Sequence, residues 1–169
     1  MQAKPAIYAL GTCLVAVTVA AGTASPSRFE AHTTGAKELT LSGSAEFGSV
    51  RGTDGSGPFV LTLGAQSSTG AVLFTRADDI QPRPGVYQLS TDPSEGIQAL
   101  VVTGPPERPT GVFRARNGQL TITRSSGDRI EGRFDLDADG FDAADPSNEA
   151  RELVVHGRFT ASPTSSAER

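Results

Sequence analysis

Cysteine, histidine and tryptophan are scarce in this chain of 169 residues. It has one cysteine, Cys13, two histidines, no tryptophan and two tyrosines. One cysteine excludes a disulfide within the chain, and a zinc site would need several thiolates or paired histidines. His32 and His156 lie far apart in the sequence, so no zinc motif is present. The shortage of tyrosine and tryptophan also argues against an aromatic platform for sugars.

Basic residues are also fewer than acidic residues. The chain has 15 basic and 19 acidic side chains, a net charge of −4. Removing residues 1–24 takes away Lys4 and no acid, which leaves 14 basic residues against 19, or −5. Nucleic-acid binding without sequence preference needs a basic surface that displaces counterions. We therefore expect no nucleic-acid partner.

The longest apolar run lies at the N-terminus and has the form of a signal peptide. Lys4 precedes the stretch "PAIYALGTCLVAVTVAA", and "GTA" before Ser25 supplies the small residues of a cleavage site. The run is short for a membrane-spanning helix, so the sequence favours a cleaved signal peptide over a retained membrane anchor, and we expect no membrane span after cleavage. Residues 1–24 are thus predicted to be a signal peptide and the protein to be extracytoplasmic: secreted, periplasmic or at the cell surface.

Cys13 raises the alternative of a lipid anchor. Threonine stands directly before it, where lipoproteins carry a smaller residue, and most of the apolar run follows it. A cleaved signal peptide should place its apolar region before the cut. The sequence therefore favours a cysteine that is removed with the signal peptide over a lipid-anchored one.

No segment keeps a helical period, whereas alternation with a period of two runs through residues 36–161. This range is predicted to be a single all-β domain, preceded by a linker at 25–35 and followed by a disordered tail at 162–169. Nineteen glycines and eleven prolines supply the turns. Short connections favour an antiparallel meander of about 8–9 strands, which forms a small barrel or a sandwich. The expected strands are 37–47, 58–65, 71–77, 86–90, 97–104, 111–116, 119–123, 130–138 and 152–161.

The dipeptide Asn117-Gly118 carries the strongest local signal for a turn. Both central residues of a type I′ hairpin need positive φ, which asparagine and glycine tolerate. A two-residue loop here pairs Phe113 with Ile122, and apolar residues then face apolar residues throughout. The sequence predicts this hairpin, followed by a three-residue loop at 125–127.

The C-terminal half resembles a known group of proteins through its glycine and aromatic pattern. The tripeptide "GRF" occurs twice in the same strand phase. The matching positions are Gly118, Leu120, Ile122, Thr123, Gly132, Phe134, Ala138, Gly157, Phe159 and Ala161. This pattern resembles small secreted or lipid-anchored bacterial all-β domains of unknown function. The resemblance implies an exported antiparallel β domain and carries over no catalytic residue.

A catalytic centre finds little support in the sequence. A hydrolase triad needs a histidine between an acid and a nucleophile. Asp135 or Asp137 can lie opposite His156, but no serine stands in a G-x-S-x-G setting. A surface strand residue paired with an aspartate is the simpler interpretation of His156. We therefore expect no enzyme activity.

The stretch "DLDADGFDAADP" at 135–146 begins like a calcium loop. An EF-hand needs a glutamate at its twelfth position, which is Pro146 here, and helices on both sides. The strand phase instead turns Asp135 and Asp137 outward and begins a loop at Asp139. What remains is a weak calcium site. Its candidate ligands are Asp137, Asp139, Asp142 and Asp145.

These observations predict an exported, non-catalytic β module that binds an unknown partner or helps to build the cell surface. One alternative is a carrier whose barrel forms a calyx for a small apolar ligand. A second alternative is a calcium-stabilised surface domain. The carrier requires a cavity, which buried phenylalanines would fill; the candidates are Phe47, Phe59, Phe74, Phe113, Phe134 and Phe159. Four outward arginines form either a docking surface or a mixed-charge solvent face: Arg114, Arg116, Arg133 and Arg158.

Overall fold

The chain folds into strands alone. The computed structural model describes residues 26–50, 57–64, 69–92, 94–105, 108–143 and 149–164, and within these ranges there are ten strands and no helix. The all-β prediction is thus confirmed. The first five strands are β1 (Arg28–Gly35), β2 (Leu39–Gly43), β3 (Ala45–Ser49), β4 (Phe59–Leu63) and β5 (Gly70–Arg76). The others are β6 (Gly85–Gln88), β7 (Ile97–Thr103), β8 (Gly111–Ser126), β9 (Arg129–Asp142) and β10 (Arg151–Pro163).

Seven of these strands close into a barrel, in the order β10-β3-β4-β5-β7-β8-β9 and back to β10. Every neighbouring pair is antiparallel except β10 and β3, which close the ring in parallel at Ser162 and Pro163. Strands β1 and β2 extend the sheet beyond β10, and β6 adds to β8. The fold is therefore a small barrel with extra strands rather than a sandwich.

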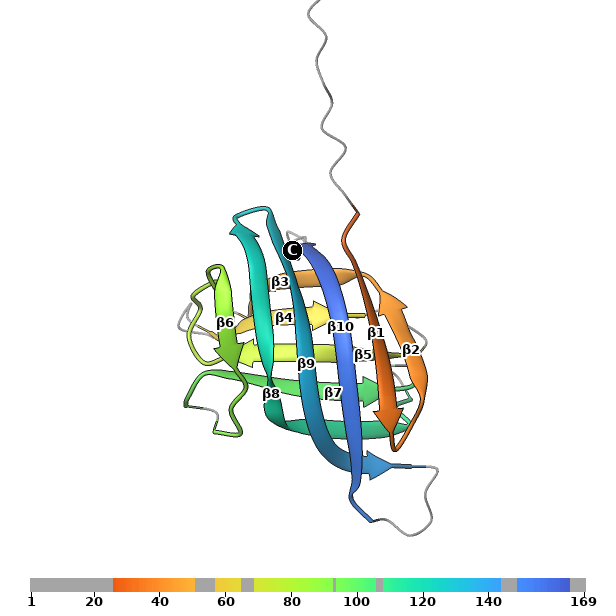
Figure 1. The fold of residues 1–169 in the computed structure, drawn as a ribbon. Helices are drawn as coiled ribbons and strands as arrows, with labels where there is room; N and C mark the ends of the chain where they lie inside the picture. The colour runs from red at the N-terminus through yellow and green to blue at the C-terminus, as the bar shows by residue number, and fades with distance from the viewer. Residues whose placement is uncertain are drawn as a thin grey trace, which may run out of the picture.

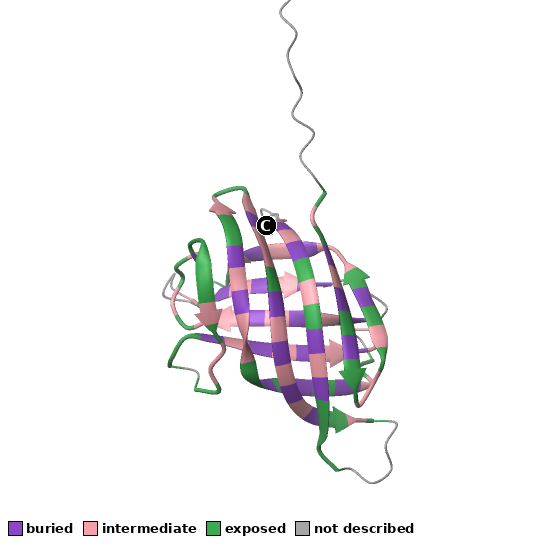
Figure 2. Ribbon diagram, viewed as in Figure 1, coloured by how far each residue is buried: buried purple, intermediate pink, exposed green. Residues whose placement is uncertain are grey.

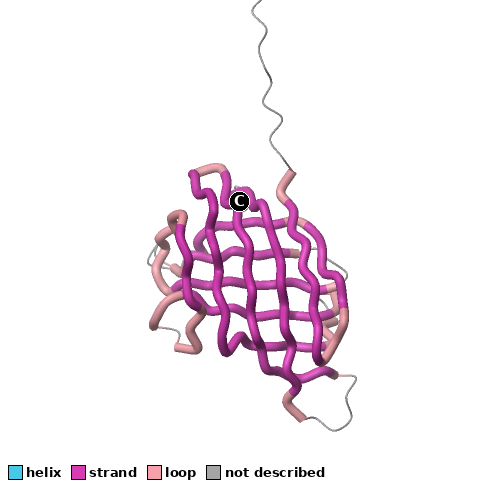
Figure 3. Tube along the Cα trace, viewed as in Figure 1, coloured by secondary structure: helices cyan, strands magenta, loops and turns pink. Residues whose placement is uncertain are grey.

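Two long strands, β8 and β9, belong to both layers of the barrel. Strand β8 pairs with β7 through residues 111–114 and with β6 through residues 119–122. Figures 1 and 3 show upright strands in front and strands that cross them behind, and β8 and β9 bend from one set into the other. Such near-orthogonal packing needs strands that bend at the corners.

The predicted hairpin at Asn117-Gly118 is wrong. Strand β8 runs through both residues without a turn and pairs with β9 on either side of them. The register shifts at a bulge between Ala115 and Asn117, where Arg116 is the extra residue, and Gly118 follows it with a positive φ of 130°. The carbonyl of Gly118 also accepts a hydrogen bond from the backbone N–H of Leu89, at 2.9 Å.

The positions of the buried apolar residues explain why a hairpin turn and a bulge give the same pattern in this sequence. Phe113 and Ala115 are buried before the bulge, and Leu120 and Ile122 are buried after it. An extra residue in one strand moves the inward-facing residues from odd to even positions. A two-residue turn between two strands produces the same shift. Local alternation therefore cannot separate them.

Three further boundaries differ from expectation. The expected linker at 25–35 is a strand from Arg28 onward, because β1 pairs with both β2 and β10 and buries Phe29 and Ala31. At the other end β10 reaches Pro163, inside the expected tail. The expected loop at 125–127 is a tighter turn, since Ser126 pairs with Arg129.

The two "GRF" tripeptides lie side by side and complement each other. In the antiparallel register Gly132 pairs with Phe159, and Phe134 pairs with Gly157. A Cβ atom at Gly132 would lie 2.9 Å from the Phe159 ring, and one at Gly157 would collide with the Phe134 ring. Each phenylalanine therefore covers the glycine of the opposite strand, which is the aromatic cover known to support glycines in curved sheets.

Phenylalanine side chains fill the barrel. The six that the sequence singles out are at most 5% exposed and belong to one continuous core. Figure 2 shows buried and more exposed residues alternating along the front strands, as the period of two requires. The rings of Phe74 and Phe134 meet edge to face at 5.3 Å between centroids.

Candidate functional site

The outer face of the sheet β2-β1-β10-β9-β8-β6 carries polar side chains in rows across the strands. Apolar residues point into the barrel, so the residues between them form polar rows that cross the strands. The "arginine row" contains Ser42, Glu30, Arg158, Arg133 and Thr121. The "histidine row" beside it contains Thr40, His32, His156, Asp135, Gln119 and Gln88.

A groove of about 550 Å³ lies over β1, β2 and β10 at one end of these rows. Its lining comprises Arg28, Phe29, Glu30, Thr40, Ser42, Gly43, Arg158, Phe159 and Thr160. Two guanidinium groups and three hydroxyl groups line it, whereas Glu30 supplies the single carboxylate of this lining. The groove therefore offers mainly hydrogen-bond donors, on a chain that is acidic overall.

Glu30 and Arg158 face each other across β1 and β10. Arg158 Nη2 donates to Glu30 Oε2 at 2.9 Å, and the Arg158 side chain is still 80% exposed. This hydrogen bond and the charge of Arg158 hold the pKa of Glu30 below its ordinary value. The carboxylate thus stays ionised and occupies part of the guanidinium fork. Arg133, the cross-strand partner of Arg158, brings a further positive charge to the same row.

The two histidines are cross-strand partners on β1 and β10. His156 Nδ1 lies 2.6 Å from Asp135 Oδ1, as the sequence interpretation of a surface pair with an aspartate expected. His32 Nδ1 lies 3.2 Å from the hydroxyl of Thr40. His32 falls within the expected linker at 25–35, and its pairing with His156 could not be predicted, because only the register between β1 and β10 brings these residues together.

A second, smaller hollow adjoins the histidine row. It measures about 200 Å³ and is lined by Gln88, Gly118, Gln119, Asp135, Leu136, Asp137 and His156. Gly118, two residues after the bulge at Arg116, belongs to this lining. The hollow is open to solvent, and His156, Asp135 and Gln119 of the histidine row line it.

Of the four predicted calcium ligands, the three that the structure describes do not all lie on one face of their strand. Strand β9 continues to Asp142, so Asp137 and Asp139 point outward and Asp142 points toward the barrel interior. Asp139 Oδ2 lies 2.9 Å from Arg116 Nε, and Asp145 lies outside the described residues. Among the residues that the structure describes, no three histidine, cysteine or acidic side chains are grouped to hold a metal ion.

The four predicted outward arginines separate into two groups. Arg133 and Arg158 share the arginine row. Arg116 joins Asp139 and Glu152 at the other end of the sheet, and Arg114 Nη2 donates to the carbonyl of Thr91 at 2.6 Å. The arginines therefore do not form one continuous stripe.

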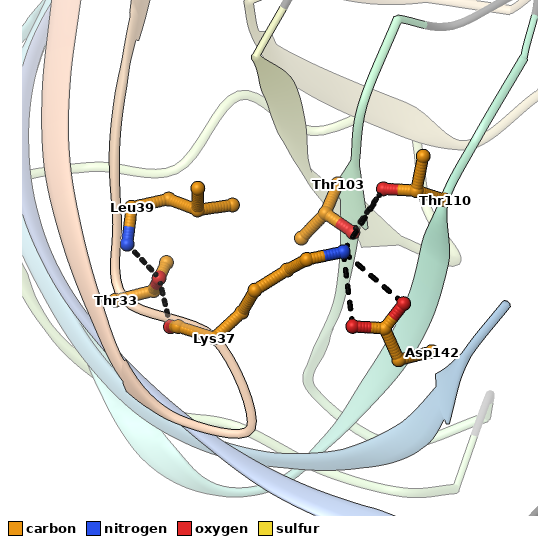
Figure 4. Close-up of polar contacts among 6 residues, drawn as sticks. All are labelled: Thr33, Lys37, Leu39, Thr103, Thr110 and Asp142. Carbon is orange, nitrogen blue, oxygen red and sulfur yellow. Dashed lines mark hydrogen bonds and ion pairs between the residues drawn. The ribbon is translucent and has the colours of Figure 1, made fainter. Parts of the chain in front are cut away.

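A polar cluster closes one end of the barrel, and Figure 4 shows it in close-up. Lys37, in the turn between β1 and β2, reaches Asp142 on β9 at 2.9 Å and donates to the hydroxyl of Thr110 at 3.2 Å. The Thr110 hydroxyl lies 3.2 Å from that of Thr103, which is fully buried. Thr33 shapes the turn by donating to the carbonyl of Lys37 at 2.6 Å. This cluster is a structural tie between distant parts of the chain.

One feature of the sequence indicates a special role for Lys37 in this cluster. Lys37 is the only lysine after Lys4, whereas arginine supplies every other positive charge of the domain. A compact ammonium on a flexible stem suits a narrow, half-buried position better than a planar guanidinium does. The signal gives no partner, since Asp142 is 105 positions away.

Replacing Lys37 by methionine is expected to lower the free energy of unfolding by about 1–3 kcal/mol. The Asp142 side chain is only 11% exposed and would lose its contact with the Lys37 ammonium. Chemical denaturation of the wild type, Lys37→Met, Asp142→Asn and the double variant checks this in a double-mutant cycle. Additive effects of the two single changes would contradict the tie.

A scan against protein-family models, a search of curated proteins and a search of solved structures found no match for the chain. The resemblance to exported bacterial β domains therefore stays a prediction. In the part of the chain that the structure describes, no helix is long and apolar enough to cross a membrane.

Proposed function

We propose that the protein is an extracytoplasmic, non-catalytic binding module that holds an acidic segment of a partner protein in the groove over β1, β2 and β10. The observation that carries the proposal is the lining of this groove. Arg28 and Arg158 stand over a hollow with three hydroxyl donors and one carboxylate. Guanidinium groups bind carboxylates through paired, charge-assisted hydrogen bonds.

The open edge of β2 supports an extended partner. The strand order begins at β2, and within the described residues only β1 pairs with it. An edge strand offers unpaired backbone groups to which an incoming strand can add. A segment in this position lies beside Thr40 and Ser42, whose exposed side chains line the groove. Its acidic side chains can then reach the two arginines.

The filled core favours this proposal over the carrier alternative. A calyx needs interior space, whereas six phenylalanines occupy the interior of this barrel. The calcium-stabilised alternative gains no support either, because Asp137 and Asp142 lie on opposite faces of β9. A partner that binds the outer face requires neither a cavity nor a metal.

Fluorescence anisotropy with a labelled peptide of alternating glutamate and threonine tests the proposal. We expect this peptide to bind, and the double variant Arg28→Gln/Arg158→Gln to bind about tenfold more weakly, because each lost charge-assisted hydrogen bond costs about 1.5–3 kcal/mol before solvent screening reduces it. Glu30→Gln is expected to strengthen binding a few-fold, since it frees the guanidinium of Arg158. Added salt should weaken binding.

Two controls separate a specific groove from general charge attraction. A peptide of alternating glutamine and threonine keeps the backbone and removes the charge. Arg83→Gln changes the net charge as Arg158→Gln does, but Arg83 precedes β6 at the opposite edge of the sheet. Equal binding of the two peptides, or equal losses in the Arg83 and Arg158 variants, would overturn the proposal.

A further inference from the structure

We propose that His32 and His156 form a chelating site for a transition-metal ion on the outer face of β1 and β10. Neither residue belongs to the groove lining, so the inference is independent of the proposed function. It rests on three observations: the register of the two strands, the partners of the two rings and the exposure of the two side chains.

The register places the imidazoles beside each other. His32 and His156 are direct cross-strand partners, and both side chains point outward. Directly opposed residues of antiparallel strands have Cβ atoms about 4.5–5.5 Å apart. A metal ion binds imidazole nitrogen at about 2.0–2.1 Å, so two neighbouring rings on one sheet face can reach the same ion.

The hydrogen bonds of both rings involve the same nitrogen. Asp135 accepts from His156 Nδ1, and the hydroxyl of Thr40 lies at hydrogen-bond distance from His32 Nδ1. When Nδ1 carries the proton, Nε2 keeps its lone pair for a metal. Metal-bound histidines commonly donate their second nitrogen to a carboxylate or another acceptor, which fixes the tautomer and orients the ring. Asp135 and Thr40 occupy these supporting positions.

The two rings are also accessible from solvent. Their side chains are 64% and 59% exposed, so an ion can approach without opening the fold. Because the described residues contain no metal-binding group of three, this site has two protein ligands and water in the remaining positions. Glu30 Oε1 lies 3.9 Å from His32 Nε2, but Arg158 holds the other oxygen of this carboxylate.

This ligand set selects a class of metal. Imidazole suits copper, nickel and zinc, whereas calcium and magnesium require oxygen ligands. With only two imidazoles the order of affinity follows that of the divalent ions, so Cu²⁺ binds most tightly. The site is therefore distinct in place and chemistry from the predicted calcium loop at 137–145.

Titration of the tag-free full-length chain with Cu²⁺, followed by calorimetry and electron paramagnetic resonance, tests the proposal. All samples carry Cys13→Ser, because this removes the one thiol that would compete for copper. We expect one tightly bound ion per chain with two imidazole nitrogens in its spectrum. His32→Ala and His156→Ala should each lower the affinity at least tenfold, and Asp135→Ala should lower it about tenfold through the lost orientation of His156.

Gln119→Ala is the matched control, since Gln119 lies in the same row next to Asp135 and cannot replace an imidazole. This variant should bind Cu²⁺ as the parent does. Circular dichroism of each variant establishes that the fold persists, which the exposure of the two histidines leads us to expect. Copper binding that survives either histidine change, or a spectrum with fewer than two imidazole nitrogens, would overturn the proposal.

Discussion

Replacing Phe134 by alanine is expected to lower the free energy of unfolding by about 3–5 kcal/mol. Phe134 is 1% exposed and meets the rings of Phe74 at 5.3 Å and Phe159 at 6.5 Å between centroids. Its ring also covers Gly157. The change therefore removes transfer free energy, aromatic contacts and the cover of a glycine, and it leaves a cavity in a closed barrel that has little freedom to collapse.

Chemical denaturation followed by circular dichroism measures this loss, and Phe141→Ala is the matched control. Phe141 lies on the same strand, β9, but points outward and is 52% exposed. The same substitution there should cost less than about 1 kcal/mol, since most surface changes have small effects. Similar losses for the two variants would show that Phe134 is not the centre of the core that we describe.

Replacing Gly118 by alanine is expected to be similarly damaging, although it adds only one methyl group. Gly118 has a φ of 130°, a conformation that residues with a Cβ atom rarely adopt and that costs about 1–3 kcal/mol. Its Cβ would also collide with the backbone carbonyl of Asp135 and lie 2.6 Å from Leu136 Cα. Because both obstacles are backbone atoms, relief requires β8 and β9 to separate where Gly118 pairs with Leu136.

Gly127→Ala provides the control for this second prediction. Gly127 lies in the turn that joins β8 to β9, and a Cβ atom there would meet nothing within 4 Å. A change in the unfolding free energy within about 0.5 kcal/mol is expected, since nothing opposes the added methyl group. If Asn117-Gly118 were instead the exposed tip of a hairpin, Gly118→Ala would not meet the backbone of β9. A loss no larger than that of Gly127→Ala would thus contradict the close approach of β8 and β9 at Gly118.

The alternation of side chains carried most of the information about the fold. A period of two places Phe134, Leu136 and Ala138 on one face of their strand, and all three are buried, as are Leu153, Val155 and Phe159 on the neighbouring strand. A strand exposes successive residues to opposite faces wherever it lies, so this inference needs no knowledge of its partner. The all-β class and the aromatic core followed from the sequence for this reason.

The alternation of side chains does not show which distant strands pair with each other. The interpretation of Asn117-Gly118 as a hairpin failed because a turn and a bulge produce the same change of phase. His32 and His156 meet only because β1 adds to the outer side of β10, and Lys37 meets Asp142 only because the barrel closes. The candidate groove depends on the same addition of β1 and β2 to β10.

The sequence by itself therefore determined the strand faces, the filled core and the composition of the outer surface. Tertiary structure alone decided that the chain forms a barrel, that its histidines lie side by side and that Asp142 turns away from Asp137 and Asp139. The physical reason is that side-chain alternation is a property of two successive residues, whereas register is set by the closure of the whole sheet.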